Sequence, residues 1–508
     1  MHDNQLKTDI NKIKGQIQKS DYRTRYVVVL LSDKTILEAP DIEDRLAVIR
    51  RATGLDPKNS LFFLPPRTSR VELQAFVTSI LAILQPVCVE YYRDLTKHAR
   101  RKKGRGTIPP PTAPPTRGTS QTLSYPGWGV RYDFKLGILA EFRQEMDAAQ
   151  RHYNAALEAL FGAEGLFETT ASWSPRWDEI RLLADIIALR HIRCQLWNNF
   201  PTSAVQSWLR YKYRLQDVLD RRGKGTNNYG WQAWESTWAQ AMAETVRRTE
   251  LPIFKIRDPS SDTDPLTDGP SSLYSQPEKQ FPVGERLPPW ELLHHAGYWH
   301  KIASDHAKRR YILAREMPEE DRTPPGMSPA AKVSTRNQIY DHYLVPQPHE
   351  EYPVPGIGNG FEHWKDISAK LNAAIAEFRA RGQHRKVDQL QLEVARTLLH
   401  VKRFDDAFKV LRPLWETMAW RKEGWWSLAS EVVWALHECA LRVQDRETYV
   451  ATEWELYSQS QYYLLFIERP SLMPLSNPWQ DKVQVRFDDM SGFLLGCISR
   501  ESERESKC

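Results

Sequence analysis

The feature that most constrains the fold is a helical periodicity that runs from Trp128 to about Phe466. Apolar residues recur there at three- and four-residue spacing, and no segment alternates apolar and polar residues long enough for a strand. The pattern predicts a mainly α-helical chain. The expected helices are 129–145, 147–161, 175–199, 202–220, 228–249, 288–316, 361–382, 384–402, 404–419, 422–443 and 446–466.

The predicted helices come in pairs joined by short turns, and some pairs place small residues opposite large ones. The first pair carries Leu136, Gly137 and Ala140 before its turn, and Ala149, Tyr153 and Ala156 after it. A second pair carries Ala395 and Leu398, then Ala407 and Leu411, and a looser third carries Ile192 and Gln195, then Ala204 and Trp208. This is the pattern of tetratricopeptide (TPR) repeats, which are about 34 residues long. We therefore predict a TPR-like α-solenoid of helical hairpins, each burying its apolar face on the next.

Residues 1–103 have a different, α/β pattern. The runs Tyr26–Leu31 and Ser60–Leu64 predict two short strands, and their alternation with helices predicts parallel pairing. The last helix, expected at Ser69–His98, starts with the spacing of a capping box, and Pro86 is expected to end or kink it. Two short strands make an incomplete sheet, so we expect further strands or a partner at its edge.

The remaining segments are rich in proline or polar residues and are predicted to lack packed structure. Residues 104–127 are expected to be a disordered proline-rich linker, and 256–287 and 317–360 to be mobile loop insertions. The predicted organisation is an α/β segment at 1–103, the linker, a helical domain at 128–470 and a tail at 471–508.

Composition narrows the cellular setting. Five cysteines form no CxxC pair and no regular spacing, which indicates a reducing, cytoplasmic compartment. No stretch of eighteen apolar residues is present, so no transmembrane segment is predicted. The net charge is +6, and the one dense basic cluster, at 97–105, lies beside the linker. A solvated linker end is the favoured interpretation of that cluster, with nucleic-acid binding as the alternative.

No pattern in the chain predicts catalysis. Gly356, Gly358 and Gly360 form GxGxG, but no strand precedes them, so a plain loop is favoured over a dinucleotide site. His294, His295, His300 and His306 share one expected helix without the four-residue spacing of a zinc helix. We therefore predict no catalytic residue, no metal, no cofactor and no enzyme activity.

Tryptophans mark two candidate docking surfaces. Trp231, Trp234 and Trp238 give one aromatic face to the helix at 228–249, and Trp425 and Trp426 open the helix at 422–443. Core packing is the favoured interpretation of both sets, and protein docking is the alternative.

Several segments resemble the foie gras family of the trafficking protein particle (TRAPP) complex, subunit 11. They are Arg25–Leu31, Ser60–Pro65, Ser172–Ala184 (SWSPRWDEIRLLA), Phe200–Ala204, Ala296–Arg310 (AGYWHKIASDHAKRR) and Glu423–Trp426 (EGWW). Their order and spacing also agree with the family over about 20–470. Members are usually about twice this long, so the chain is expected to be a fragment or shortened form of a fungal member.

The resemblance implies a non-catalytic scaffold subunit of a TRAPP vesicle-tethering complex in ER-to-Golgi transport and autophagy. The implied partners are other TRAPP subunits, a small sedlin-like core subunit among them, and indirectly a Rab-type GTPase. The implied location is cytoplasmic, peripheral at the cis-Golgi and the ER–Golgi intermediate compartment.

One alternative is a general TPR-type adaptor that binds the peptide tails of partner proteins. Such an adaptor needs a carboxylate clamp, for which Lys135 and Arg143 are the nearest candidates.

Overall fold

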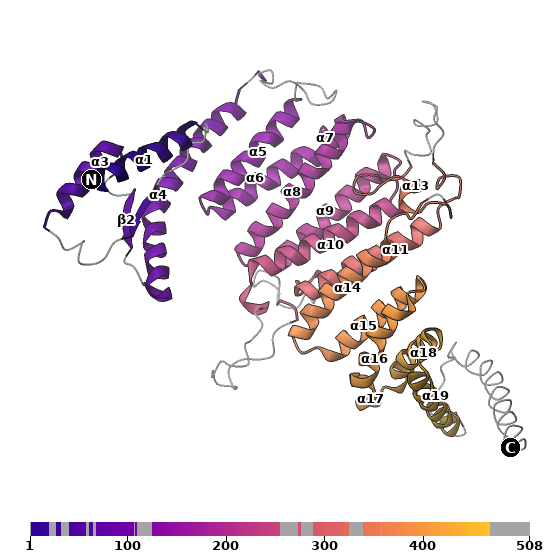
Figure 1. The fold of residues 1–508 in the computed structure, drawn as a ribbon. Helices are drawn as coiled ribbons and strands as arrows, with labels where there is room; N and C mark the ends of the chain where they lie inside the picture. Colours follow the sequence, from indigo (N-terminus) through magenta and orange to yellow (C-terminus); the bar gives the residue numbers. More distant parts are fainter. Residues whose placement is uncertain are drawn as a thin grey trace, which may run out of the picture. The chain divides into compact units, whose positions relative to one another are not determined.

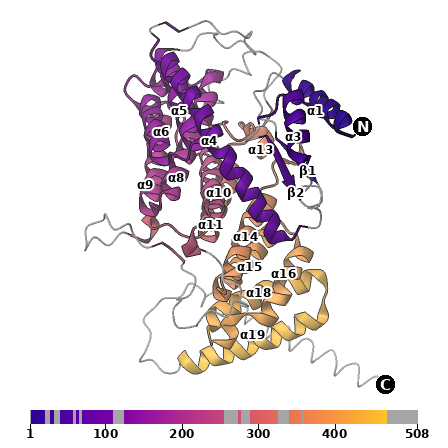
Figure 2. The ribbon, with the colours of Figure 1, turned by 90° about the vertical axis from the view of Figure 1, so that its left-hand side faces the viewer.

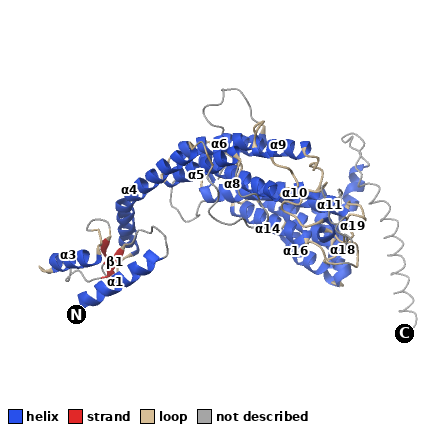
Figure 3. Ribbon diagram, turned by 90° about the horizontal axis from the view of Figure 1, so that it is seen from above, coloured by secondary structure: helices blue, strands red, loops and turns tan. Residues whose placement is uncertain are grey.

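The computed structural model describes residues 2–19, 27–31, 40–56, 60–64, 68–105, 107–108, 124–254, 273–275, 288–324, 339–356 and 358–467. Most of the predicted linker, of the 256–287 insertion and all of the 471–508 tail lie outside these residues. The described part is mainly helical (Figure 1), and its strands lie near the N-terminus (Figure 3). The chain divides into two compact units, Met1–Glu377 and Phe378–Cys508. Their boundary falls inside helix α14 (His363–Ala380), where no domain boundary was expected.

The predicted parallel pairing of the two strands is confirmed. Strand β1 (Val28–Leu31) pairs in parallel with β2 (Leu61–Leu64), with Val28 opposite Leu61. Helices α1 (His2–Lys19) and α3 (Ile42–Thr53) contact each other beside the strands (Figure 2). A small core joins Ile10, Ile49 and Leu55 to Val28. The second sheet face carries Val29 and Leu31, which are exposed.

Helix α4 (Arg70–Lys103) is continuous through Pro86, so the proline does not end the helix. Its start is the predicted capping box: the Glu72 amide donates to the Ser69 hydroxyl at 3.3 Å, and the Ser69 amide donates to the Glu72 carboxylate at 2.9 Å. Most of the basic cluster lies in its last turns, where positively charged side chains interact favourably with the negative end of the helix dipole.

The C-terminal half of α4 is anchored to α5 (Tyr125–Phe142). The Trp128 indole donates to the Lys102 carbonyl at 3.1 Å, and Lys103 pairs with Asp133 at 2.6 Å. Part of the basic cluster is therefore engaged in packing and does not act as a free linker end.

The most apolar part of α4 bears on the expectation that no segment spans a membrane. An eighteen-residue window in this helix has a mean hydropathy of 1.6 and is not buried at all. By length and composition alone, α4 is therefore long and apolar enough to cross a membrane, and among the described helices it alone meets that test.

The rest of the first unit is a series of helices in mutual contact. Along the chain α5 packs on α6, α6 on α8, α8 on α9 and α10, and α10 on α11 (Figure 1). Large buried side chains fill the contacts, Tyr153, Trp177 and Trp299 among them. The bounds are α6 Met146–Phe161, α7 Leu166–Thr169, α8 Pro175–Trp197, α9 Pro201–Arg221, α10 Tyr229–Thr249, η1 Pro252–Phe254, η2 Pro289–Glu291, α11 Ala296–Arg315 and α13 Pro348–Glu351.

The second unit is built from α15 (His384–His400), α16 (Phe404–Thr417), α17 (Ala419–Lys422), α18 (Trp426–Val443) and α19 (Arg446–Ile467). The helix expected at 422–443 begins only at Trp426. Gly424 ends the short α17 in a left-handed conformation, with φ of 79°, and a helix cannot continue through that backbone.

Six of the short connections between helices use the same turn. The turn has a left-handed middle residue, and the next amide donates to the carbonyl five residues earlier, as in a Schellman motif. The middle residues are Gln144, Asn199, Gly382, Lys402, Gly424 and Gln444, with φ of 61°, 59°, 69°, 60°, 79° and 65°. These turns join α5 to α6, α8 to α9, α14 to α15, α15 to α16, α17 to α18 and α18 to α19.

Because a left-handed conformation strains any residue with a Cβ atom, Lys402→Gly should stabilise the chain. We expect the free energy of unfolding to rise by about 0.5–1 kcal/mol in a urea titration. Lys409→Gly, at an exposed position inside α16, makes the same chemical change in a helical backbone and should cost about 1 kcal/mol. If the two substitutions change the free energy of unfolding in the same direction, the turn assignment is contradicted.

The expected 317–360 insertion is only partly a loop. Residues 339–351, here called the 339–351 segment, pack into the first unit, and Asp341, Val345 and Glu351 are buried. The expectation of a mobile insertion is therefore wrong for this segment, because buried charges hold it in place.

Candidate functional site

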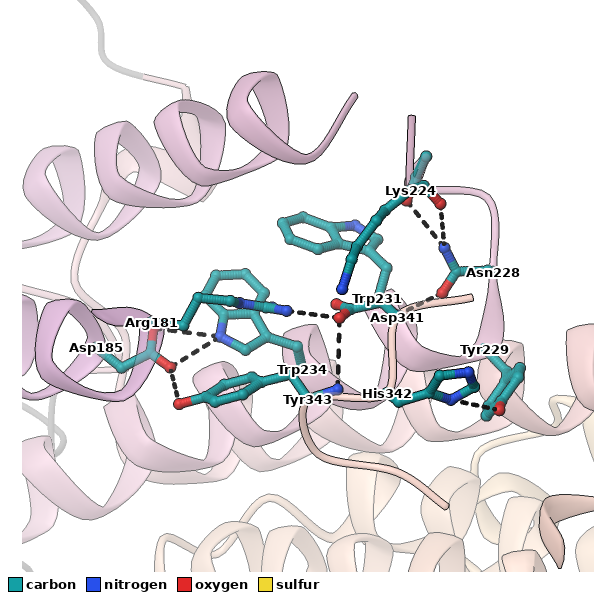
Figure 4. A network of polar contacts seen from close by, with 11 residues as sticks. Arg181, Asp185, Lys224, Asn228, Tyr229, Trp231, Trp234, Asp341, His342 and Tyr343 are labelled. Carbon is teal, nitrogen blue, oxygen red and sulfur yellow. Dashed lines mark hydrogen bonds and ion pairs between the residues drawn. The ribbon is translucent and has the colours of Figure 1, made fainter. Parts of the chain in front are cut away.

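A cluster of polar side chains joins α8, α9 and α10 to the 339–351 segment. Figure 4 shows its members from α8, α10 and the segment. We call it the Arg181 cluster. Its members are Arg181, Asp185, Tyr211, Trp234, Asp341 and Tyr343. The cluster combines an arginine, two carboxylates and two tyrosines, which are groups that catalysis commonly uses.

The ion pair of the cluster is completely enclosed. Arg181 Nη1 lies 2.6 Å from Asp341 Oδ1, and the two residues are 0% and 1% exposed. The guanidinium also lies over the ring of Tyr343, 4.2 Å from its centroid. Arg181 therefore contacts two residues of the 339–351 segment, Asp341 and Tyr343.

The second carboxylate, Asp185, lies one turn further along α8 on the same face as Arg181. It accepts hydrogen bonds from Tyr211 Oη at 2.6 Å, from Tyr343 Oη at 3.1 Å and from Trp234 Nε1 at 3.3 Å. One carboxylate therefore accepts from three donors that come from α9, α10 and the 339–351 segment. Figure 4 shows two of them, Trp234 and Tyr343.

Local sequence explains why α10 can approach the segment so closely. Asn228 caps α10, and its side chain accepts from the Trp231 amide at 3.0 Å. A Cβ atom at the helical Gly230 would overlap the carbonyl of Asp341, so only glycine fits at this contact.

A second buried ion pair fixes the far end of the segment. Arg310 on α11 binds Glu351 with two hydrogen bonds, Nε to Oε1 at 2.6 Å and Nη2 to Oε2 at 2.7 Å. Glu351 is 0% exposed. The 339–351 segment is therefore held near both its ends by arginines from two different helices.

The surroundings push the pKa values of the two carboxyls in the Arg181 cluster apart. Burial raises the pKa of Asp185, and its hydrogen bonds and Arg181 offset this only in part. Burial also acts to raise the pKa of Asp341, but the attraction and hydrogen bond of Arg181 outweigh it, so this pKa lies below its usual range. Such a pair can mark an acid–base site. Here each carboxylate accepts hydrogen bonds from protein donors, Asp341 through Oδ1 alone, and Asp341 is closed to solvent, so we interpret the cluster as a structural clamp.

The three tryptophans of α10 belong to the core, so their expected alternative role in docking is wrong. Trp231, Trp234 and Trp238 are 2%, 2% and 3% exposed. Their rings stack in sequence, with centroids 4.7 Å and 5.6 Å apart, and Trp238 also stacks on Trp208. Residues covered this completely offer no surface to a partner.

One of the two residues considered for the carboxylate clamp of a TPR-type adaptor cannot serve in it. The side chain of Arg143 is 5% exposed and is bound to Glu145 at 2.7 Å and to Thr96. A guanidinium engaged in this way cannot serve as a carboxylate clamp, whereas Lys135 is exposed.

The residues predicted to pack the repeats lie in contacts between helices. Between α5 and α6, a Cβ atom at Gly137 would enter the ring of Tyr153, and Tyr153 Oη donates to Glu141 at 2.6 Å. All ten are buried: Leu136, Gly137, Ala140, Ala149, Tyr153, Ala156, Ala395, Leu398, Ala407 and Leu411. Their role in TPR-like repeats stays a prediction.

The other weak motifs fall in ordinary surroundings. Gly356 and Gly360 lie in the irregular stretch before α14, with φ of 96° and 64°. His294 and His295 precede α11, so the four histidines do not share one helix as expected. Among the described residues, no group of three His, Cys, Asp or Glu side chains could hold a metal ion.

A buried histidine makes the first unit sensitive to acid. His191 on α8 is 8% exposed, and burial, with a contribution from Arg210, lowers its pKa to about 4. Because this pKa is below that of an unfolded histidine, about 6.5, the stabilisation is complete above that pH and is lost as the pH falls toward 4.

We therefore expect His191→Leu to reduce the pH dependence of stability. Between pH 8 and pH 5 the unmodified chain should lose about 2 kcal/mol through this group, and the variant should not. Urea titrations of both proteins at the two pH values measure the difference. If both proteins lose the same free energy of unfolding between the two pH values, the His191 side chain is not buried in its neutral form.

Comparison with known proteins agrees with the resemblance noted in the sequence. A family model described as "Trafficking protein particle complex subunit 11 N-terminal domain" matches residues 1–73. The model described as "Foie gras liver health family 1" matches residues 176–459, more than half of the chain. The chain belongs to the foie gras family. The predicted resemblance is thereby confirmed.

A human relative of this foie gras chain is named "Trafficking protein particle complex subunit 11". It is 19% identical over 454 residues, which are 86% of this chain and 34% of the human protein. The chain thus spans about a third of the length of this relative.

The clamp lies inside the foie gras match, but sequence reasoning singled out only one of its residues, Trp234, and as a candidate for docking. The two arginines that hold the 339–351 segment, Arg181 and Arg310, were nevertheless in view. Arg181 lies in Ser172–Ala184 and Arg310 ends Ala296–Arg310, the segments that carried the resemblance. A further signal was available in Ile339–Tyr343 (IYDHY), because aromatic residues around a single aspartate are unusual in a mobile loop.

Trp425 and Trp426 remain the accessible tryptophans of the predicted set. They are 50% and 44% exposed at the start of α18, and Arg385 lies 5.5 Å from the Trp425 ring centroid. Their exposure is compatible with docking, which stays a prediction.

Proposed function

We propose that this foie gras chain is a non-catalytic scaffold subunit of a TRAPP vesicle-tethering complex. The observation that carries the proposal is that two family models match in order along the chain, the first of them named for TRAPP subunit 11. The structure supports a scaffold role because the Arg181 cluster binds helices to each other and its ion pair is closed to solvent.

The proposed cellular role is support of Rab guanine-nucleotide exchange in ER-to-Golgi transport and autophagy. In this role the chain contributes binding surface and other subunits contribute the exchange site. We propose a small sedlin-like core subunit as one neighbour and a cytoplasmic location, peripheral at the cis-Golgi.

We also propose that the helical hairpins form a TPR-like α-solenoid. Three observations support this: successive helices are in contact, small residues face large ones between α5 and α6, and six short connections share one turn. In a solenoid, each hairpin stacks on the next in the same way, and a turn of constant geometry keeps the two helices of each hairpin in the same relative orientation.

The test is an affinity purification of the tagged chain from a fungal cell, with the recovered proteins identified by mass. Recovery of several small TRAPP core subunits in near-equal amounts supports the scaffold role. A folded chain that returns alone, or with unrelated proteins only, refutes it. The double variant Trp425→Ala/Trp426→Ala, in the same assay, tests whether these side chains are part of the docking surface.

A further inference from the structure

The end of α4 carries a positive charge as large as that of the whole chain. Residues 93–105 contain seven basic side chains and one acidic side chain, an excess of +6, and the complete chain has a net charge of +6. The rest of the sequence is therefore neutral overall. A charge excess that is confined to one short segment is typical of a surface that binds an anionic partner.

One side of these turns packs on α5. At 100° per residue, the residues on this side fall within an arc of about 60°, and they are Tyr92, Thr96, Ala99 and Lys103. Arg143 donates a hydrogen bond to Thr96, and Lys103 pairs with Asp133 at 2.6 Å. Thr96 and Ala99 are buried. This side of the helix is therefore not available to a partner.

Another side of the same turns is basic. Its residues fall within a separate arc of about 100°, and they are Arg93, Lys97, Arg100 and Arg101. We call these four residues the α4 basic stripe. All four are exposed, and every residue of 91–103 that falls within this arc is basic. The stripe therefore presents cations to solvent over about two turns of the helix.

Three acidic side chains lie near the stripe, and two of them already have a partner. Asp94 binds Lys97 at 3.0 Å. Glu145 is bound by Arg143 at 2.7 Å, and its pKa is lowered by that hydrogen bond first and, more weakly, by two arginines of the stripe. The third, Glu90, is exposed one turn before the stripe begins. Among the described residues, the three arginines of the stripe take part in no ion pair, so their charge is available to a partner.

The position of the stripe favours a planar partner. It lies on the outward side of one helix, and such a surface is convex. A peptide ligand is ordinarily held in a groove or along the edge of a sheet. A phospholipid membrane instead presents its phosphates over a plane, and clusters of four to eight Lys and Arg residues on a helix are typical of binding to anionic lipids.

A nucleic acid also presents phosphates to a convex basic surface. Trp128 and Tyr132 lie beside the last turns of α4, but they are 6% and 5% exposed, so their rings cannot stack on bases as in proteins that bind single strands. The proposed function also favours a membrane, because a subunit of a vesicle-tethering complex works at a membrane surface.

We propose that the α4 basic stripe binds the anionic headgroups of a phospholipid membrane directly. Each guanidinium of the stripe can donate two parallel hydrogen bonds to one phosphate, and Lys97 adds a single ammonium. The choice of a membrane rests on the proposed function, but the contact is made by this chain without another subunit. Because the attraction is between exposed charges, binding should weaken as salt is added.

The test measures binding of the purified full chain to vesicles of phosphatidylcholine, with and without phosphatidylserine, by sedimentation. Arg100→Gln/Arg101→Gln removes two charges from the stripe. Arg247→Gln/Arg248→Gln is the matched control, because these are also adjacent arginines in the last turn of a helix. The control arginines lie 2.9 Å and 3.6 Å from Glu244. All four positions are exposed, so both variants should fold, and circular dichroism with a thermal midpoint checks that they do.

We expect the unmodified chain to bind vesicles that contain phosphatidylserine, to leave vesicles of phosphatidylcholine alone unbound, and to dissociate at high salt. The stripe variant should bind about thirtyfold more weakly, since each cation near an anionic membrane contributes about fivefold. The control variant should change binding less than about twofold, because its arginines lie outside the stripe and distant charges are screened.

Four results would overturn the assignment. A folded chain that binds neither kind of vesicle makes no such contact. Equal weakening by the two variants would show an effect of net charge that does not depend on the stripe. Binding that persists at high salt, or that phosphatidylcholine alone supports, would show insertion of apolar side chains instead. Binding to a short RNA, a DNA duplex or a polyglutamate peptide that exceeds vesicle binding and is lost in the stripe variant would give the stripe a different occupant.

Failure of the proposed function looks different. The affinity purification described above needs no lipid, so recovery of TRAPP subunits by a chain that binds no vesicle would remove the lipid contact and keep the scaffold role. Vesicle binding by a chain that recovers no TRAPP subunit would keep the lipid contact and refute the scaffold role.

Discussion

Replacing Arg181 by methionine should lower the free energy of unfolding of the first unit by about 3–5 kcal/mol. The substitution leaves the carboxylate of Asp341, which is 1% exposed, buried without its counter-charge. It also removes the cation from the face of Tyr343. A urea titration followed by tryptophan fluorescence reports the change, because Trp234 lies in the same cluster.

Two control variants show whether the loss of stability comes from a buried charge that is left without its partner. Arg181→Met/Asp341→Leu removes both partners and should recover most of the stability, because neither charge is then buried alone. Lys97→Ala breaks an ion pair to Asp94 whose side chains are 68% and 60% exposed, and should cost less than about 0.5 kcal/mol.

The pH dependence of the Arg181→Met penalty has a definite sign. With Arg181 present, the pKa of Asp341 lies below its usual range, so the pair stabilises the fold above that range and the gain is lost as the pH falls. Without Arg181, the buried carboxyl takes up a proton more readily. The penalty should therefore be largest near neutral pH and shrink in acid, whereas a penalty that grows in acid would contradict the charge argument.

Most helix positions followed from the sequence because a buried face repeats every three or four residues. The helix expected at 147–161 lies at Met146–Phe161, and that expected at 384–402 lies at His384–His400. The division between α17 and α18 was missed because it depends on the φ of a single glycine, which periodicity does not report. The helix expected at 288–316 was also too long, since η2 ends at Glu291 and α11 begins at Ala296.

The clamp could not be predicted in the same way. Arg181 and Asp341 are 160 positions apart, and Asp341 lies in a stretch whose composition resembles a loop. The shared turn was equally hidden, because Gln144, Lys402 and Gln444 occupy positions where glycine would have been the recognisable residue. For Trp231, Trp234 and Trp238 the pattern allowed both a core and a docking surface, and only the burial decides between them.

Gly230→Ala should separate the 339–351 segment from α10 and cost about 2–4 kcal/mol of the free energy of unfolding. The new methyl group would overlap the carbonyl of Asp341, which is backbone and cannot turn aside as a flexible side chain can. The segment has to move away, and the same movement draws Asp341 from Arg181. Faster hydrogen exchange in 339–351 should accompany the loss of stability.

The matched control makes the same chemical change where there is room for it. A Cβ atom at Gly129 in α5 meets nothing within 4 Å, so Gly129→Ala should stabilise the chain by about 0.5–1 kcal/mol through helix propensity. The two glycine-to-alanine substitutions are thus expected to have opposite signs. In the Arg181→Met/Asp341→Leu background the cost of Gly230→Ala should fall, because the displaced segment no longer carries a buried ion pair. An unchanged cost in that background would mean that Gly230 and the Arg181 cluster act independently.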